Sequence, residues 1–489
     1  MSTPRVRMAP SPTGFLHIGT ARAALFNYLF AKHHGGTFIL RIEDTDLERS
    51  DKKFEKNIFE GLRWLGIEPD EGVEQGGPFA PYRQTERLET YQKHLDRLFN
   101  KNLAFYCFHT KEELEKEQEE LQNAKRPALH LCEYRTMDPV EAEELARINP
   151  NYVIRFKTPP ARRITFHDLI RGEITFETDI LGDFSIARKK NAPLYHFAVV
   201  VDDIEMQITH AIRGEDHIPN TPKHILLFEA LGFAMPQFAH LPLVLGPDRS
   251  KLSKRHGATS IDEFRKEGYL SEALFNFIAL LGWSPGDDQE IMPKEEIIEL
   301  FSLEKMQKSG AIFDIQKLDW MNGEYIRRKS PHELVELCRP YLDDFLQMTN
   351  SKLQISKKEE EEYLKKIIVL EQPRLKKLSE IGERVDFFFR TPEYDKELLR
   401  WKGMDDGELK KSLELSLRIL EYQTPEVTKE DLEKLFFEEI GKNDKGKILW
   451  PLRVALTGKK GSPGPFEIIE ILGKDVSTQR ITIALGKLG

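Results

Sequence analysis

The N-terminal sequence predicts a β-α-β unit, and this prediction constrains the fold more than any other feature. Residues 6–8 suit a buried strand, which prolines and a glycine end between positions 10 and 14. Apolar side chains then recur at helical spacing over residues 21–30, and a mostly apolar strand follows over residues 38–42. Two strands joined by a helix imply a parallel sheet covered by helices, which is half of a nucleotide-binding fold.

The chain is too long for a single core, because it has 489 residues, 40% hydrophobic and 31% charged. An acidic helix and three strand-like pieces (VIRFKTP, RITFHDLI and GEITFE) interrupt the first pattern. An apolar strand signal resumes at YHFAVVVDDIEMQITHAIRGEDH, and from about Ile261 the pattern is helical. We therefore predict a multidomain α/β protein: a Rossmann-type parallel sheet with an inserted α+β domain, followed by all-α helical domains. The predicted divisions are 1–80 and 191–260 for the two sheet halves, 81–190 for the insertion, 261–325 for one helical domain and 326–489 for the other helical domains.

Composition narrows the location and the kinds of partner. The N-terminus has no apolar signal core and no run of eighteen uncharged apolar residues occurs, so we expect a cytoplasmic protein without a membrane span. Three cysteines, Cys107, Cys132 and Cys338, are too few for a disulfide framework and suggest reduced thiols. The net charge of -9 means that any nucleic acid must meet local basic patches.

The tetrad HIGT, His17–Thr20, stands at the predicted start of the first helix. Free backbone N–H groups and the positive end of the helix dipole bind phosphates at this place in parallel α/β folds. His17 can donate to a phosphate oxygen, Gly19 leaves room for a base or ribose, and Thr20 can cap the helix or bond to a ligand. Taken alone, the tetrad fits a capped structural helix equally well.

A second basic element, KLSKR, spans residues 251–255 between two segments rich in glycine and proline. Lys251 and Lys254 suit a triphosphate, because mobile ammonium groups can stabilise the charge that develops during attack at an α-phosphate. Taken alone, such a stretch is usually a solvated loop.

Together and in this order, the two elements resemble the paired signature motifs of class I aminoacyl-tRNA synthetases. The longer strings are similar to the bacterial glutamyl-tRNA synthetase family over nearly the whole chain: APSPTGFLHIGTARAALFNYLFA, FILRIEDTD, YHFAVVVDD, IRGEDHIPNT and LSKRHGATS. Thr20 at the end of the first motif is usual in that family. The resemblance implies a glutamate–tRNA ligase that forms glutamyl-adenylate from glutamate and ATP and transfers the glutamyl group to the 3′ end of tRNA(Glu).

The resemblance assigns residues to both substrates by position. It implies a glutamate pocket in which Glu43 meets the ammonium group and Arg213 meets the side-chain carboxylate, which favours glutamate over glutamine. The implied glutamate-binding residues are Arg7, Ala9, Ser11, Glu43, Tyr195 and Arg213. The implied ATP-binding residues are His17, Gly19, Thr20, Glu215, Leu245, Lys251, Ser253 and Lys254, of which His17, Gly19, Thr20, Lys251 and Lys254 act in catalysis. Val199 departs from relatives that carry Asn there.

Asp202 and Asp203 follow the predicted strand in this region. Paired carboxylates can bind metal or act in acid-base chemistry, but helix capping and structural hydrogen bonds are the better interpretation. The glutamate α-carboxylate itself attacks ATP, so no protein nucleophile is required. Mg²⁺ is implied as the companion of ATP, held mainly by phosphates and water.

The insertion carries a partial zinc pattern, and the helical part carries one implied tRNA contact. Cys107, His109 and Cys132 can supply three ligands, with Tyr134 or His130 as the fourth, and buried free thiols are the alternative. By resemblance, the insertion meets the tRNA acceptor stem and Arg374 contacts the anticodon.

Several alternatives stay open at this point. A glutaminyl-tRNA synthetase is disfavoured by the helical C-terminal part, a catalytically silent tRNA-binding paralogue by the intact motifs, and a small-molecule nucleotidyltransferase by the long helical tail. The sequence leaves open whether tRNA(Gln) is charged as well. A monomer is the usual state of the family.

Overall fold

The computed structural model describes residues 3–125, 129–348, 357–422, 428–441 and 444–489, and these form two compact units. The first unit comprises residues 1–265 and 271–315, and the second comprises residues 266–270 and 316–489. We describe each unit by itself. None of the helices in the described ranges combines the length and apolar character that a membrane span requires.

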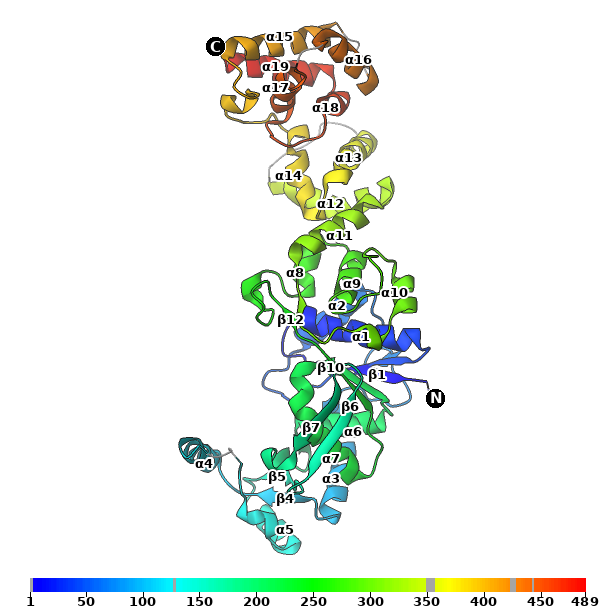
Figure 1. Ribbon diagram of the computed structural model, residues 1–489, viewed down its shortest axis with the longest axis vertical. Coiled ribbons are helices and arrows are strands. Elements are labelled where there is room, and N and C mark those ends of the chain that lie inside the picture. Colours follow the sequence, from blue (N-terminus) through cyan, green and yellow to red (C-terminus); the bar gives the residue numbers. More distant parts are fainter. Residues whose placement is uncertain (1–2, 126–128, 349–356, 423–427, 442–443) are drawn as a thin grey trace. The chain divides into compact units, whose positions relative to one another are not determined.

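A seven-stranded sheet organises the first unit (Figure 1), and its strand order is β3-β2-β1-β10-β11-β6-β7. All neighbouring strands pair in parallel except β6 and β7, which form an antiparallel hairpin. The strands are β1 (Arg5–Met8), β2 (Thr37–Leu40), β3 (Glu71–Gly72), β6 (Arg163–Asp168), β7 (Gly172–Glu177), β10 (His210–Gly214) and β11 (Gln237–Leu241). The predicted parallel β-α-β unit is confirmed: β1 pairs with β2, and α1 (Ile18–His33) connects them.

Helix α1 is buried on nearly every side, which explains its lack of a polar face. It packs against β1, β2 and β10, and also against α9 (Ser271–Ala279) and α10 (Lys294–Leu300). Figure 1 shows α1 on one side of the sheet and α6 (Tyr195–Glu205) and α7 (Thr221–Leu231) on the other. Outside the insertion, this unit also contains the α-helices α2 (Lys52–Trp64), α3 (Leu88–Asn100) and α8 (Ile261–Lys266). A separate two-stranded parallel sheet pairs β12 (Val244–Leu245) with β13 (Ala311–Ile312).

The prediction of a strand from Tyr195 onward was wrong for the first half of that segment. Residues Tyr195–Glu205 form helix α6, and only His210–Gly214 form a strand. The segment from Phe197 to Asp203 is buried throughout, between the sheet and helices α3 and α7. A fully buried helix and a fully buried strand both read as an unbroken apolar run, so periodicity could not separate them.

The insertion has its own four-stranded antiparallel sheet, β4-β5-β8-β9. Its elements are β4 (Ala104–Cys107), α4 (Lys111–Asn123), α5 (Pro139–Ile148), β5 (Val153–Phe156), β8 (Phe184–Lys189) and β9 (Ala192–Pro193). Two of the strands expected there, β6 and β7, lie elsewhere: the hairpin extends the seven-stranded sheet, with Asp168 opposite Phe238 of β11. The alternating side chains of β6 bury Ile164, Phe166 and Asp168 against the first unit's core, and this burial decides where the hairpin pairs.

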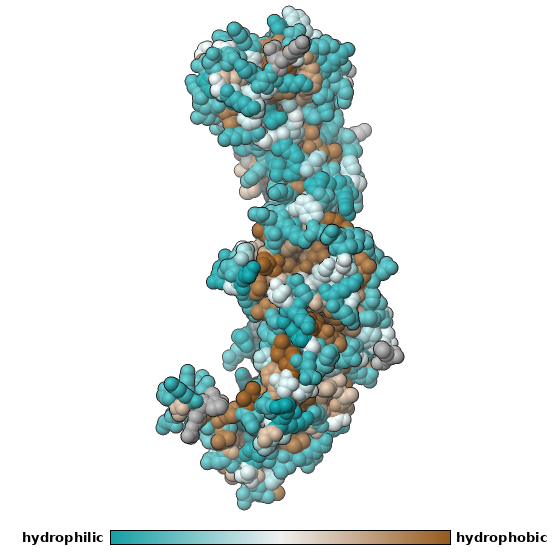
Figure 2. All heavy atoms as spheres, in the orientation of Figure 1, coloured by the Kyte–Doolittle hydropathy of each residue, from teal (hydrophilic) through white to brown (hydrophobic). Residues whose placement is uncertain are grey.

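The second unit is helical, as predicted. Its helices are α11 (Ile315–Arg327), α12 (Pro331–Met348), α13 (Lys357–Glu371), α14 (Ile381–Val385), α15 (Asp406–Glu421), α16 (Lys429–Ile440), α17 (Gly446–Thr457), α18 (Pro465–Leu472) and α19 (Lys474–Gly486). Helices α15, α17 and α19 pack together, and buried Arg480 of α19 donates to the carbonyls of Leu456 and Phe387, both at 2.6 Å. Figure 2 shows hydrophilic side chains over most of the visible face of both units.

Candidate active site

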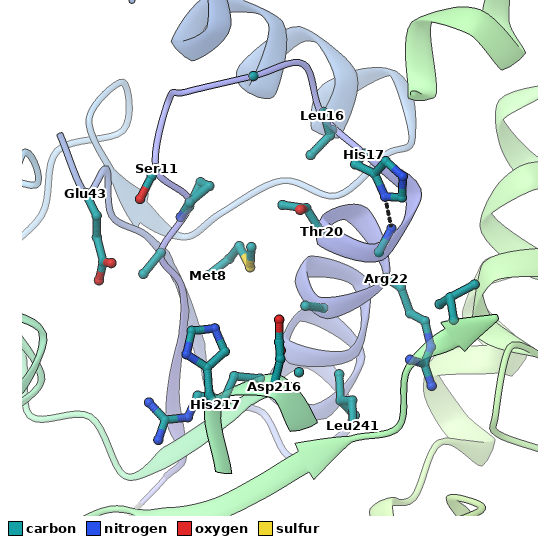
Figure 3. A pocket seen from close by; sticks show the side chains of 18 of the residues that line it. Met8, Ser11, Leu16, His17, Thr20, Arg22, Glu43, Asp216, His217 and Leu241 are labelled. Carbon is teal, nitrogen blue, oxygen red and sulfur yellow. Dashed lines mark hydrogen bonds between the residues drawn. The ribbon is translucent and has the colours of Figure 1, made fainter. Parts of the chain in front are cut away.

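A cavity of about 590 Å³ opens at the carboxyl ends of β1 and β10. The chain leaves β1 toward β2 on one side and leaves β10 toward β11 on the other, so the two strands form the topological switch point at which parallel α/β sheets bind ligands. The predicted residues that line the cavity are Arg7, Ala9, Ser11, His17, Gly19, Thr20, Glu43, Tyr195, Arg213 and Lys251. In Figure 3, Ser11, Glu43 and His217 lie toward one end, and His17, Thr20 and Arg22 lie along α1 toward the other.

His17 is the N-cap of α1, and its Nδ1 accepts a hydrogen bond from the Gly19 backbone N–H at 3.1 Å. Burial and the charges of Lys251 and Lys254 lower the pKa of His17, against the opposing charge of Glu263, so the ring is neutral at pH 7. A neutral ring that accepts at Nδ1 carries its proton on Nε2. His17 is therefore prepared to donate to an anion in the cavity. Thr20 stands in the first turn and does not cap the helix, contrary to one of its two predicted roles.

The basic loop brings one of its two lysines to the cavity. Lys251 lines the cavity wall, and its backbone forms an isolated antiparallel β-bridge with Leu245. Its Nζ lies 3.7 Å from Oδ2 of Asp216. Lys254 and Ser253 lie outside the lining, where Lys254 begins a short 3₁₀ turn over Lys254–His256. The structure therefore separates the two lysines, to which the sequence analysis gave the same role: Lys251 lines the cavity and Lys254 does not.

Glu43 belongs to a buried network of charges at the other end of the cavity. Arg41 donates to Glu43 at 3.2 Å and to Asp203 at 2.9 Å, and Arg7 binds Asp203 through two hydrogen bonds of 3.0 and 3.1 Å. Burial raises the pKa of Glu43 to about 7, although Arg41 and Arg7 oppose the shift. Arg41 is fully buried and was missed in the sequence, where it reads as an ordinary charge between apolar residues.

Asp202 and Asp203 hold the sheet to α6, which corrects half of their predicted role. Both lie within the last turns of α6, so neither caps a helix. Asp202 accepts hydrogen bonds from Arg87 at 2.7 Å, from Gln84 at 2.8 Å and from the Tyr91 hydroxyl at 2.9 Å. The predicted structural hydrogen bonds are therefore present, and those from Arg87, Arg7 and Arg41 are also buried ion pairs.

Arg213 is buried beside the cavity and, in the part of the chain that the structure describes, it forms no ion pair with a carboxylate. Its guanidinium contacts Nε2 of His240 at 3.3 Å, Nδ1 of His224 at 3.1 Å and Oγ1 of Thr221 at 2.8 Å. Burial lowers the pKa of Arg213 to about 10, so it stays charged at pH 7. It presents a positive charge beside the cavity that a ligand carboxylate can neutralise.

Glu215 and Leu245 lie just outside the lining, and Arg22 lies on it. Glu215 accepts from the Leu243 backbone N–H at 2.7 Å and pairs with Arg171. Arg22 is buried, and it donates to the carbonyls of Leu281 at 2.6 Å and Pro242 at 2.5 Å. Its position one turn after His17 on the same helix was the only sequence signal for it.

Comparison with known proteins agrees with this geometry. Residues 4–320 match the family described as tRNA synthetases class I (E and Q), catalytic domain, and residues 333–485 match an anticodon binding domain. The chain belongs to the class I tRNA synthetases of the E and Q type. It is 49% identical to glutamate–tRNA ligase 1 of Caldicellulosiruptor saccharolyticus and 47% identical to glutamate–tRNA ligase of Carboxydothermus hydrogenoformans, with 98% of each chain covered in both cases. A solved glutamate tRNA ligase from Elizabethkingia meningosepticum in complex with its amino acid superposes with a TM-score of 0.88 at 36% identity over 100% of both chains.

The insertion of the synthetase holds four convergent ligand atoms. Cys107, His109, His130 and Cys132 place their Sγ and ring nitrogen atoms within 4.8 Å of one another. The Cys107 Sγ lies 3.6 Å from Nδ1 of His109 and 3.6 Å from Nε2 of His130. Tetrahedral zinc with one sulfur and one nitrogen ligand requires a separation of about 3.5 Å, so the cluster fits zinc. His130 contributes the fourth of these atoms, and the ring of Tyr134 packs against that of His109.

In the helical unit of the synthetase, Arg374 ends a short 3₁₀ turn after α13. Its Nε is 3.7 Å from Oε2 of Glu371, which is buried, and Arg384 approaches the same oxygen at 3.9 Å. The Arg374 side chain is about one-third exposed (31%), so Glu371 holds it at the surface with donors left for another group.

Proposed function

We propose that this synthetase activates L-glutamate with ATP and transfers the glutamyl group to the 3′ end of tRNA(Glu) for protein synthesis. The observation that carries the proposal is the charge pattern of the cavity. A carboxylate, Glu43, lies at one wall, and Arg213, a cation with no ion-pair partner among the described residues, lies at another. This pattern is complementary to an amino acid with an ammonium group and a side-chain carboxylate.

Glutamate would bind with its ammonium group at Glu43 and its side-chain carboxylate at Arg213, next to Tyr195. Arg7, Ala9 and Ser11 complete this part of the wall. Because the network around Asp203 fixes Arg7 and Arg41, the site is formed before the substrate arrives. Val199 lines the cavity as an apolar side chain and offers no hydrogen bond.

ATP would lie over the start of α1 and reach the basic loop. His17 would donate from Nε2 to a phosphate oxygen, and Gly19 leaves its face of the helix open to the nucleotide. Thr20, Glu215, Leu245, Ser253 and Lys254 complete the proposed nucleotide site. The glutamate α-carboxylate attacks the α-phosphate and displaces pyrophosphate, which gives glutamyl-adenylate. The ammonium group of Lys251 stabilises the charge that develops on the phosphoryl oxygens. Mg²⁺ enters with ATP.

Different parts of the chain would contact different parts of the tRNA. We propose that residues 81–190 meet the acceptor stem, that 261–325 contact the stem region, and that 326–489 read the anticodon, with Arg374 among the contacts. The match of residues 333–485 to an anticodon binding domain supports the last assignment. We also propose that the protein is a cytoplasmic monomer. Three free, buried cysteines suit a reducing compartment.

Charging of purified tRNAs tests the proposal. With ATP and Mg²⁺, we expect labelled glutamate on tRNA(Glu) and no labelled glutamine on either tRNA(Glu) or tRNA(Gln). Glutamate on tRNA(Gln) as well would identify a non-discriminating enzyme. Charging of glutamine, or no charging of any tRNA, would contradict the proposal.

We propose that the cluster of Cys107, His109, His130 and Cys132 holds a structural zinc ion. Zinc would tie the end of β4 to residues 130–132, far from the cavity lining. We expect about one zinc per purified chain. The zinc should be lost in Cys132→Ser and retained in Cys338→Ser, because Cys338 is a buried thiol of α12 that does not belong to the cluster. Elemental analysis measures it, and zinc-free protein purified without chelator would refute the site.

A further inference from the structure

Hydrogen bonds connect Arg213 to a set of buried side chains, and the chemistry of each group determines which partner donates. Guanidinium N–H groups can only donate, so every partner of Arg213 must accept. His240 therefore accepts at Nε2 and His224 accepts at Nδ1. Burial lowers the pKa of both histidines, as does the charge of Arg213, so both are neutral.

A neutral histidine that accepts with one nitrogen must donate with the other. His240 donates from Nδ1 to Oδ2 of Asp168, at 2.6 Å, and His224 donates from Nε2 to Nδ1 of His196, at 3.2 Å. Asp168 and His240 are both fully buried. The proton on His240 is thus directed away from Arg213 and toward a carboxylate that lies in β6.

Asp168 is held in one orientation. Its Oδ1 accepts from the backbone N–H groups of Ile170 at 3.0 Å, Arg171 at 2.8 Å and His240 at 3.3 Å. Although burial opposes ionisation, the hydrogen bonds from His240 and from the backbone keep the pKa of Asp168 below its usual value. It is an ionised, acceptor-only group at pH 7.

We propose that Asp168 and His240 are positioning residues that determine the preference for a side-chain carboxylate: Asp168 fixes the His240 tautomer, and His240 then orients Arg213 without neutralising it. This inference rests on the proposed function of Arg213. A carboxylate in place of His240 would occupy the guanidinium and compete with the substrate. A neutral acceptor satisfies one N–H group and leaves the charge available.

The substitution Asp168→Asn tests the tautomer with almost no change in volume. The asparagine Oδ1 must remain on the three backbone N–H groups, because Nδ2 cannot accept from them. Nδ2 then donates to His240 Nδ1, which forces the ring proton onto Nε2, opposite the Arg213 Nε–H. We expect the glutamate KM to rise about tenfold to a hundredfold, as for loss of a hydrogen bond to a buried charge. The kcat and the ATP KM should stay within about twofold, because neither the nucleotide end nor Lys251 is touched.

Two controls separate this role from general destabilisation. Asp179→Asn changes the same residue type just beyond β7, where Asp179 is exposed and accepts from the Ala161 N–H at 2.7 Å. It should leave both KM values unchanged. The double variant Asp168→Asn/Arg213→Ala should have the glutamate KM of Arg213→Ala alone, since Asp168 acts through Arg213. If the two substitutions raise the glutamate KM additively, Asp168 does not act through Arg213.

The wild-type protein gives a direct reading even if Asp168→Asn does not fold. In ¹⁵N-histidine spectra, assigned by the loss of one signal in His240→Asn, His240 should carry its proton on Nδ1. A proton on Nε2 would overturn the inference. An unchanged glutamate KM in Arg213→Ala would refute the proposed pocket. A raised glutamate KM in Arg213→Ala with a normal one in Asp168→Asn would refute only the positioning role of Asp168 and His240.

Discussion

Replacing Arg213 by alanine should raise the glutamate KM by about a hundredfold to a thousandfold, the cost of leaving a buried charge unpaired. In the variant, the substrate carboxylate would enter the cavity beside the neutral His224 and His240 with no cation to meet it. The kcat at saturating glutamate and the ATP KM should change little, because Arg213 lies away from His17 and the basic loop. Steady-state charging with varied glutamate and with varied ATP measures both.

Arg213→Lys is the matched control for charge. Lysine keeps the positive charge but cannot make the forked contact with Thr221, His224 and His240. We expect a smaller rise in the glutamate KM than for alanine. If alanine leaves the glutamate dependence unchanged, Arg213 is not part of the pocket.

Replacing Lys251 by alanine should lower kcat for adenylate formation by about a hundredfold to a thousandfold, the usual cost of removing one group that stabilises developing charge. Lys251 lines the cavity, and its ammonium group has only Asp216, at 3.7 Å, as an ion-pair partner within the described residues. The glutamate KM should change by less than about threefold, since the contact strengthens only in the transition state. Pyrophosphate exchange in the presence of tRNA measures the step.

Arg249→Ala removes a positive charge from the same loop at an exposed position outside the cavity lining. It should retain nearly full kcat, which separates a local effect of Lys251 from the general charge of the loop. Equal losses in kcat and in glutamate affinity for Lys251→Ala would show that Lys251 supports binding instead of the chemical step.

The sequence predicted those parts of the protein that depend on neighbours along the chain. The β-α-β unit, the start of α1 at His17 and the helical second unit all follow from spacing within about twenty residues. The motif pair also identified the family, and most of the implied pocket residues do line one cavity.

Only the tertiary structure decided the features that depend on long-range pairing and burial. It showed that the mostly buried apolar run at 195–205 is helix α6 and not a strand, and it placed the β6–β7 hairpin beside β11. It brought a ring nitrogen of His130 to the atoms of Cys107, His109 and Cys132. It also surrounded Arg213 with neutral acceptors from α7 and β11, the next helix and strand along the chain, and linked one of them, His240, to Asp168, which lies 72 residues away in sequence. The sequence shows which residues carry charge. Which of these charges lack an ion-pair partner depends on contacts that form only when the chain folds.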